Sequence, residues 1–222
     1  MTARTGTPTG TQTTGTQAAG TDAAAPLRLA VIVGSVREGR FGPVVADWFA
    51  GEARAHGTFD VDVLDLAEAE HVLPVAFPDF SAPVPDDVAR VRSGLAERLD
   101  AADAFVIVTP EYNHSFPAAL KNTIDWFHGE WQAKPVGFVS YGGMSGGLRA
   151  VEQLRQVFPE LHAVTVRDSL SFHSAWERFD GAGRPHDAEG SAAAAKGMLG
   201  QLEWWGTALR QARGSAPYGP AA

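Results

Sequence analysis

The sequence has 222 residues, of which 45% are hydrophobic and 20% are charged, and a formal net charge of −8. These values predict one globular domain with a tail, and the negative charge argues against a broad nucleic-acid-binding surface. The absence of cysteine excludes disulfide scaffolds, thiolate zinc sites, cysteine nucleophiles and iron–sulfur clusters.

The two ends of the chain are expected to lie outside the folded domain, which we place at residues 26–213. Residues 1–25 are rich in Thr, Gly, Ala and Gln, which predicts a disordered tail rather than a signal peptide or membrane anchor. Residues 214–222 are expected to be a loose end. The absence of cysteine fits a reducing cytoplasm, where we expect the protein to reside. No apolar run reaches the roughly 18 residues needed to cross a bilayer, so we expect no membrane partner.

Strands and helices alternate along the predicted domain. In chain order, we predict a strand at Leu27–Val33, a helix at Pro43–His56, a strand at Phe59–Leu66, a Pro-rich connection at Ala67–Pro85, a helix at Asp86–Leu99, a strand at Asp103–Thr109, a helix at Pro117–His128, a strand at Pro135–Ser140, a helix at Gly146–Val157, a strand at Leu161–Val166, an irregular segment at Ser169–Gly190 and a helix at Ser191–Ala212. Continuous apolar runs such as LRLAVIV indicate strands buried on both faces of a parallel sheet. The alternation predicts a three-layer α/β sandwich.

Ligands of such sheets bind beyond the carboxyl ends of the strands, where the strand order reverses. The loops after the first, third and fourth strands are therefore the expected binding loops. They read GSVREGRFG (Gly34–Gly42), PEYNHSFP (Pro110–Pro117) and YGGMSGG (Tyr141–Gly147).

The first loop has the composition of a phosphate cradle. Ser35 offers a hydroxyl group, and Arg37 and Arg40 offer guanidinium groups that suit bidentate contacts with phosphate oxygens. The helix that follows points free N–H groups at the same place. A strand–helix turn with solvated arginines is the alternative. The loop matches neither GxGxxG nor GxxxxGK[ST], so we interpret Asp65, at the end of the second strand, as a loop or cap residue rather than a ribose-binding acid.

The second and third loops suit a flat ligand. Tyr112 presents a polarisable ring beside backbone polar groups, and Asn113 tolerates unusual backbone angles. The many glycines of the third loop let its backbone lie against a flat or phosphorylated group. Taken singly, the second loop could be a tight turn and the third a flexible surface loop.

Together, GSVREGRFG, PEYNHSFPAALKNTIDW and YGGMSGG resemble the NADPH-dependent FMN reductase family, which includes FMN, quinone and azo-dye reductases. The resemblance spans about Leu27 to Val166. It implies a flavodoxin-like, five-stranded parallel sheet in the order 2-1-3-4-5, a non-covalently bound FMN, and NADPH or NADH as the reductant. It implies no catalytic side chain, since the chemistry takes place at the flavin N5 atom.

The resemblance also implies which residues contact FMN. The phosphate contacts are Ser35, Arg37 and Arg40, with backbone contacts from Phe41 and Gly42, although many relatives carry Ser or Thr in place of Arg40. The isoalloxazine contacts are Pro110, Glu111, Tyr112 and Asn113. The pyrimidine-edge contacts are Tyr141, Gly142, Gly143, Ser145 and Gly146.

The resemblance further implies a homodimer or homotetramer. Trp126, Phe127 and Trp131 are candidates for its interface, and core packing accounts for them equally well. Core packing is also the expectation for Trp204 and Trp205. No pair among the seven histidines has helical ligand spacing with an acidic partner, so we predict no metal site.

The leading hypothesis is therefore an NAD(P)H-dependent FMN oxidoreductase that passes electrons to a small acceptor, which could be free flavin, a quinone, an azo compound or a metal ion. The alternative is a non-catalytic electron carrier resembling flavodoxin, whose negative charge would dock on a basic protein partner. A flavin-free scaffold on the same fold is a third possibility, because fold does not fix function.

Overall fold

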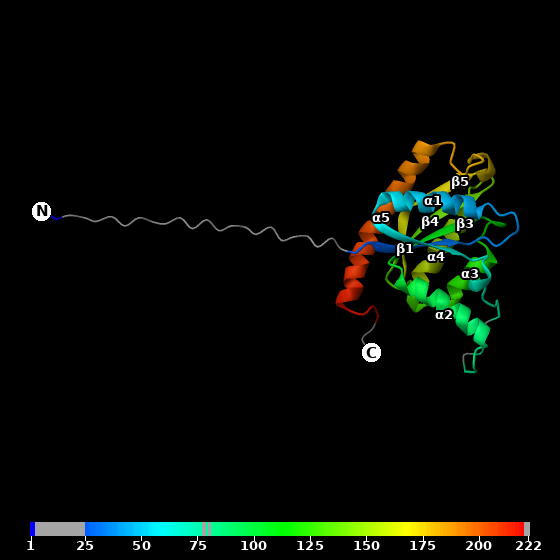
Figure 1. Cartoon of the computed structure of the whole chain (residues 1–222), viewed down its shortest axis with the longest axis horizontal. Coiled ribbons are helices and arrows are strands. Elements are labelled where there is room, and N and C mark those ends of the chain that lie inside the picture. Colours follow the sequence, from blue (N-terminus) through cyan, green and yellow to red (C-terminus); the bar gives the residue numbers. More distant parts are fainter. Residues whose placement is uncertain (3–24, 77–78, 80, 220–222) are drawn as a thin grey trace.

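A computed structural model describes residues 1–2, 25–76, 79 and 81–219, with a five-stranded parallel sheet at its centre (Figure 1). Most of the predicted N-terminal tail lies outside the described residues. The strands are β1 (Leu27–Val33), β2 (Phe59–Asp65), β3 (Ala104–Pro110), β4 (Pro135–Gly142) and β5 (Val164–His173). The helices are α1 (Gly42–His56), α2 (Asp86–Ala101), α3 (Ala118–Trp126), α4 (Leu148–Glu160) and α5 (Ala188–Ser215), with short 3-10 helices η1 (Ala69–His71), η2 (Gly129–Trp131) and η3 (Ala175–Glu177). The strand order is β2-β1-β3-β4-β5, which confirms the predicted fold class.

Helices cover both faces of the sheet. In Figure 1, α1 and α5 lie on one face, and α2, α3 and α4 lie on the other. Each face has its own core: Phe49 and Met198 belong to the first, and Phe105 and Phe158 to the second. All seven residues of β3 are buried, as its apolar run predicts.

The parallel register brings the carboxyl ends of the strands to one edge. Val33 of β1 is paired with Asp65 of β2 and with Val108 of β3, and Pro110 of β3 is paired with Tyr141 of β4. The three predicted binding loops therefore start at the same edge of the sheet.

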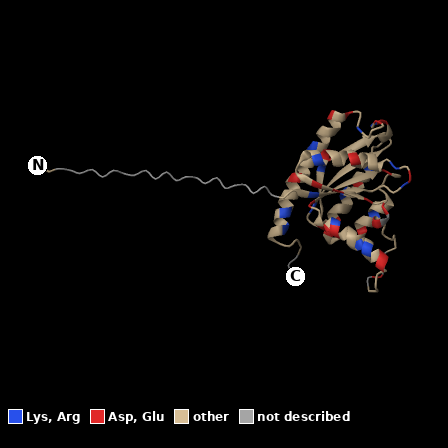
Figure 2. Ribbon diagram, in the orientation of Figure 1, with Lys and Arg blue, Asp and Glu red and all other residues tan. Residues whose placement is uncertain are grey.

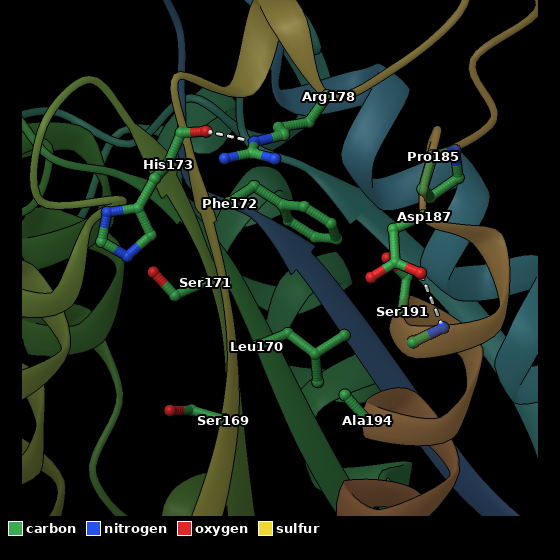
Figure 3. A pocket seen from close by; sticks show the side chains of 11 residues that line it. Ser169, Leu170, Ser171, Phe172, His173, Arg178, Pro185, Asp187, Ser191 and Ala194 are labelled. Atoms are coloured by element: carbon green, nitrogen blue, oxygen red, sulfur yellow. Dashed lines mark hydrogen bonds between the residues drawn. The ribbon is translucent and has the colours of Figure 1, made fainter.

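The prediction for the fifth strand was wrong at both ends. β5 begins at Val164 and continues to His173, through residues that we expected to be irregular. Past Val166 its residues read RDSLSFH, and Figure 3 shows Ser169, Ser171 and His173 on one side of the strand and Leu170 and Phe172 on the other. Such alternation is typical of an edge strand with one buried face. The pairing of β5 with β4 also shifts register between Val136 and Phe138, so this alternating stretch follows an irregularity after the first residues of β5.

Bonds from two helices close part of the outer edge of β5. The Arg155 guanidinium of α4 donates to the backbone carbonyl groups of Val166 (2.7 Å) and Arg167 (2.9 Å). The backbone N–H of Asp168 donates to the Gln201 side chain of α5 (3.1 Å). The backbone of this stretch is thus bonded on its outer side.

The longest helix, α5, also differs from its prediction. It starts at Ala188, where the Asp187 side chain caps it by accepting from the Gly190 amide, and it runs to Ser215. The segment expected to be loose therefore begins inside the helix. Beyond the helix, the Tyr218 hydroxyl lies 2.9 Å from His162 Nδ1.

The predictions for the aromatic residues had different outcomes. Trp126, Phe127 and Trp131 are at most 4% exposed, so they pack within the chain and are not an exposed interface. Core packing was the wrong expectation for Trp204 and Trp205, which are 65% and 36% exposed on α5. None of the helices in the described part of the chain is both long and apolar enough to span a membrane. Figure 2 shows acidic and basic residues interspersed over the helices.

Candidate functional site

Two hydroxyl groups lie buried beneath the start of α1. Ser35 is fully buried, and Tyr141 is 5% exposed. Neither Ser35 Oγ nor Tyr141 Oη makes a hydrogen bond of standard geometry within the described residues. Both approach Gly42 so closely that a Cβ atom there would lie 2.7 Å from the Tyr141 hydroxyl oxygen. Burial raises the pKa of Tyr141, so its hydroxyl stays protonated. Buried polar groups without partners are unfavourable, so these hydroxyls suit a polar ligand.

The start of α1 adds backbone donors to the same place. Its N-cap residue is Phe41, whose side chain caps no N–H group, and its first turn has no acidic residue. The free N–H groups of such a helix start, and its dipole, favour an anion. The loop before it also carries Arg37 and Arg40. The five residues predicted to contact phosphate, Ser35, Arg37, Arg40, Phe41 and Gly42, therefore lie together at the start of α1.

Arg37 connects the first loop to the second. Its guanidinium carbon lies 3.6 Å from the centre of the Tyr112 ring. Arg37 is exposed and Tyr112 is half-buried, so the ring holds the arginine in place while its donors remain accessible.

Arg40 forms an ion pair with Asp65. Both of its terminal nitrogens donate to the Asp65 carboxylate at 2.7 Å, and Nη1 also donates to the Ser35 carbonyl at 3.0 Å. The hydrogen bonds to Asp65 raise the pKa of Arg40. Asp65 also accepts from the Ala67 backbone N–H at 3.0 Å, which agrees with its interpretation as a cap residue. Arg40 thus ties the first loop to the end of β2.

The second loop is a tight turn. Tyr112 and Ser115 exchange two backbone hydrogen bonds, at 2.8 and 3.0 Å. Between them, Asn113 has a φ of 51° and His114 a φ of 70°. Two consecutive residues with positive φ define a type I′ turn, in which asparagine is well tolerated. The turn presents Tyr112 and Asn113 at the edge of the sheet.

Glu111 connects the second loop to the third. Its carboxylate accepts from the Ser145 hydroxyl at 2.6 Å and from the Arg149 backbone and side chain at 3.2 and 2.9 Å. Burial would raise the pKa of Glu111, but these hydrogen bonds outweigh it and lower the pKa. The ionised Glu111 therefore fixes the third loop against the second.

Contacts with β4 and β5 determine the conformation of the glycine-rich third loop. The Gly146 carbonyl accepts from Ser140 Oγ at 2.8 Å and from Ser171 Oγ at 2.9 Å. Gly147 has a φ of 88°, and a Cβ atom there would lie 2.6 Å from the Ser140 Cβ, so this position requires glycine. The amides of Gly143, Met144 and Ser145 donate to no backbone acceptor of the described residues, and they are available to a ligand.

A cavity of about 320 Å³ lies beside these loops, between β5 and the start of α5 (Figure 3). Its lining includes Phe172, Arg178, Asp187 and Ser191, and none of the fourteen predicted contact residues. Arg178 donates from Nε to the His173 carbonyl at 3.1 Å. This cavity adjoins the loop cluster and is not part of it.

Glu68, Glu70 and His71 form a group with the composition of a metal site. His71 is buried, and its two ring nitrogens lie 2.7 Å from the Asp65 carbonyl and 2.8 Å from Arg98 Nη1. Because the guanidinium can only donate, Nε2 accepts and Nδ1 carries the proton. Both nitrogens are occupied, so this imidazole is not free to bind a metal.

A family model described as NADPH-dependent FMN reductase matches residues 27–177, which include all three loops. The chain belongs to the NADPH-dependent FMN reductase family. The NAD(P)H-dependent FMN reductase of Schizosaccharomyces pombe is 37% identical over 136 residues, which are 59% of this chain and 64% of that relative. The quinone reductase of Escherichia coli K12 is 32% identical over 145 residues, 63% of this chain and 73% of that relative.

A solved structure agrees with the family fold. FerB of Paracoccus denitrificans, described as a flavoenzyme NAD(P)H:(acceptor) oxidoreductase, aligns with a TM-score of 0.63 and 24% identity. The alignment covers 82% of this chain and 98% of that one. This likeness supports the flavodoxin-like fold.

Some residues of the site were not predicted from the family motifs. Arg149 follows the third loop, and its pairing with Glu111 becomes visible only once β3 and β4 are neighbours. The role of Asp65 as the partner of Arg40 could have been found, because adjacent parallel strands place the ends of β1 and β2 side by side.

Proposed function

We propose that this chain is an FMN-dependent oxidoreductase that passes electrons from NADPH or NADH through a bound FMN to a small acceptor such as free flavin, a quinone, an azo compound or a metal ion. The observation that carries the proposal is the connection of three loops at one sheet edge, around two buried hydroxyl groups without partners. The reductase names of the relatives support it.

The residues present fit a phosphorylated flavin. Ser35, Arg37 and the free amides at the start of α1 would bind the phosphate. The hydroxyl of Tyr141 points to this phosphate end, so we assign its side chain there, while its backbone lies at the start of the glycine-rich loop. Arg40 would act mainly through its pair with Asp65.

The remaining contacts would hold the ring. The isoalloxazine contacts proposed are Pro110, Glu111, Tyr112 and Asn113, and the pyrimidine-edge contacts are Gly142, Gly143, Ser145 and Gly146. The free amides of the third loop can stabilise negative charge on a ligand that lies against them. Glu111 orients that loop and transfers no proton. When bound, FMN would supply the electron-transfer chemistry, and the chain would supply binding, orientation and electrostatics.

The visible spectrum of the purified full chain, with and without added FMN, is the first test. We expect one equivalent of tightly bound flavin, and we expect its absorbance to bleach rapidly on anaerobic mixing with NADPH or NADH. Addition of a quinone or free FMN should then restore the absorbance. A chain that takes up no FMN would refute the proposal.

The same mixing experiment separates the electron carrier from the enzyme. A carrier would bind FMN, and its flavin would stay oxidised in the presence of either nicotinamide. The carrier hypothesis drew on the net charge of −8, but acidic and basic residues are interspersed over the helices in view in Figure 2. We therefore favour the enzyme.

Two further proposals follow from the family. We propose a cytoplasmic location, because a reaction that consumes NADPH or NADH needs a compartment that keeps them reduced. We also propose a homodimer or homotetramer, whose mass can be measured by light scattering. Since Trp126, Phe127 and Trp131 are buried, other surfaces would have to form its interface.

A further inference from the structure

An exposed tryptophan lies at the rim of the glycine-rich loop. Trp176, the middle residue of η3, is 62% exposed. Its indole Cη2 atom lies 3.6 Å from the position that a Cβ atom would take at Gly143. The next loop residue, Met144, is 90% exposed. Gly143, Met144 and Trp176 carry no charge and lie on or against this loop, and we call these three residues the rim patch.

Two hydrogen bonds fasten the backbone before Trp176 to this loop. The Ser174 amide donates to the Gly143 carbonyl at 3.0 Å, and His173 Nδ1 lies 2.8 Å from the Met144 carbonyl oxygen. Ser174 has a left-handed backbone, with φ of 48° and ψ of 52°, and this conformation directs the chain into η3. A non-glycine residue is held in that region only where its surroundings determine it.

Buried residues hold η3 on both sides of Trp176. Ala175 is fully buried, and Phe179 is 7% exposed and packs against the Phe172 ring at 4.9 Å. The indole therefore stands on a fixed backbone, while most of its own surface remains in water. No aromatic ring of the described residues pairs with it. Exposed indole surface on a fixed support can bind a ring with little further loss of conformational entropy.

We propose that the rim patch is a subsite for the planar aromatic ring of a quinone-class acceptor, with Trp176 as its stacking face. The inference rests on the proposed function, which assigns Gly143 to the cofactor site. A neutral ring suits a patch without charged side chains, and offset or edge-to-face contact with an indole stabilises such a ring. The position of the patch, beside the proposed cofactor loop, would hold an acceptor next to the electron source.

The test compares Trp176→Ala with Trp204→Ala in the FMN-loaded full chain. Trp204 is a matched control because it is similarly exposed, at 65%, and lies far along α5. Without reductant, equilibrium dialysis gives the dissociation constant for 1,4-naphthoquinone. We expect it to rise about tenfold in Trp176→Ala, to rise less than about threefold in Trp176→Phe, and to stay unchanged in Trp204→Ala.

Steady-state kinetics adds a second readout. The KM for naphthoquinone should rise by a similar factor in Trp176→Ala, with kcat and the rate of ferricyanide reduction unchanged, because ferricyanide has no ring to stack.

Three results would overturn the inference. Equal naphthoquinone affinities of Trp176→Ala and Trp204→Ala would remove the stacking role. Equal weakening of FMN and naphthoquinone binding would place Trp176 in the cofactor site instead. A change of oligomeric mass in Trp176→Ala alone would make it an interface residue. A wild-type chain that takes up no FMN would instead refute the proposed function itself.

Discussion

The guanidinium carbon of Arg37 lies 3.6 Å from the centre of the Tyr112 ring, and this contact joins the loop after β1 to the loop after β3. The hydrogen bond from Ser145 to Glu111, at 2.6 Å, joins the loop after β3 to the loop after β4. Three segments that are far apart in the sequence therefore form one connected structure. Each segment alone could be an ordinary turn, and their connection is what distinguishes a site.

Arg37→Ala should weaken FMN binding far more than Arg90→Ala. Arg37 stands beside the uncapped start of α1, whereas Arg90 is an exposed residue of α2. Loss of a charge-assisted contact with phosphate should raise the dissociation constant by roughly ten- to a hundredfold. Titration of flavin fluorescence measures both constants. Equal values for the two variants would remove Arg37 from the cradle.

Gly42→Ala and Gly51→Ala, both in α1, should have opposite effects. A Cβ atom at Gly42 would crowd the Tyr141 hydroxyl at 2.7 Å, while nothing lies within 4 Å of one at Gly51. Overpacking at Gly42 should lower the free energy of unfolding by about 1–3 kcal/mol and abolish tight FMN binding. Alanine at Gly51 should raise that free energy by roughly 0.5–1 kcal/mol and leave FMN affinity unchanged. Urea unfolding with flavin titration checks both, and normal FMN affinity in Gly42→Ala would contradict the assignment.

Tyr141→Phe should separate binding from stability. The Tyr141 hydroxyl is buried beside the Ser35 hydroxyl and makes no hydrogen bond of standard geometry, so its removal should leave the flavin-free protein as stable as before or up to about 1 kcal/mol more stable. The same change should weaken FMN binding about tenfold, since the ligand loses a donor. Thermal unfolding with and without FMN gives both quantities. A large loss of stability in the flavin-free variant would show that the hydroxyl has a structural role.

Lys134 should give the stability an alkaline pH dependence. Its buried ammonium donates to the carbonyls of Leu99 and Asp100, and burial lowers the pKa of Lys134 from 10.5 to about 8. At pH values between these two pKa values, Lys134 is protonated in the unfolded chain and deprotonated in the folded chain. Folding therefore becomes more favourable as the pH rises. From pH 7 to 10, the wild type should gain up to roughly 3 kcal/mol relative to Lys134→Met.

Urea unfolding of both proteins at several pH values measures this gain. Lys196→Met, which changes an exposed lysine of α5, is the control and should track the wild type throughout. A constant difference between the wild type and Lys134→Met across this range would show that the lysine titrates normally.

Much of the fold could be predicted because burial leaves a clear pattern. β3, and β1 apart from the exposed Arg28, are buried on both faces, so they read as nearly continuous apolar runs, and the predicted limits of β1 are the observed ones. β5 was missed in its second half because an edge strand with one exposed face mixes polar and apolar residues. The short 3-10 helices and the ends of α3 depend on tertiary contacts, such as the bond from Trp126 to the Pro74 carbonyl, which no local pattern encodes.

The structure brings the three predicted loops to one edge of the sheet, and the contacts among their side chains were foreseen less well. Motif positions identified Ser35, Arg37 and Glu111 as site residues. The ion pair of Arg40 with Asp65 and the hydrogen bond of Ser145 with Glu111 were not foreseen, because each depends on which strands are neighbours in the sheet. Trp176 was predicted only as part of the irregular segment Ser169–Gly190, and its position beside the glycine-rich loop follows from the bond from Ser174 to Gly143.

The bonds along β5 also limit how copies of this chain can associate. An open strand edge can recruit another strand, which is a common start of aggregation. Here Arg155 and Gln201 occupy the carbonyl groups of Val166 and Arg167 and the amide of Asp168, so an incoming strand would find these three backbone groups already bonded. A strand that paired with this part of β5 would first have to displace both side chains, which makes sheet extension there unfavourable.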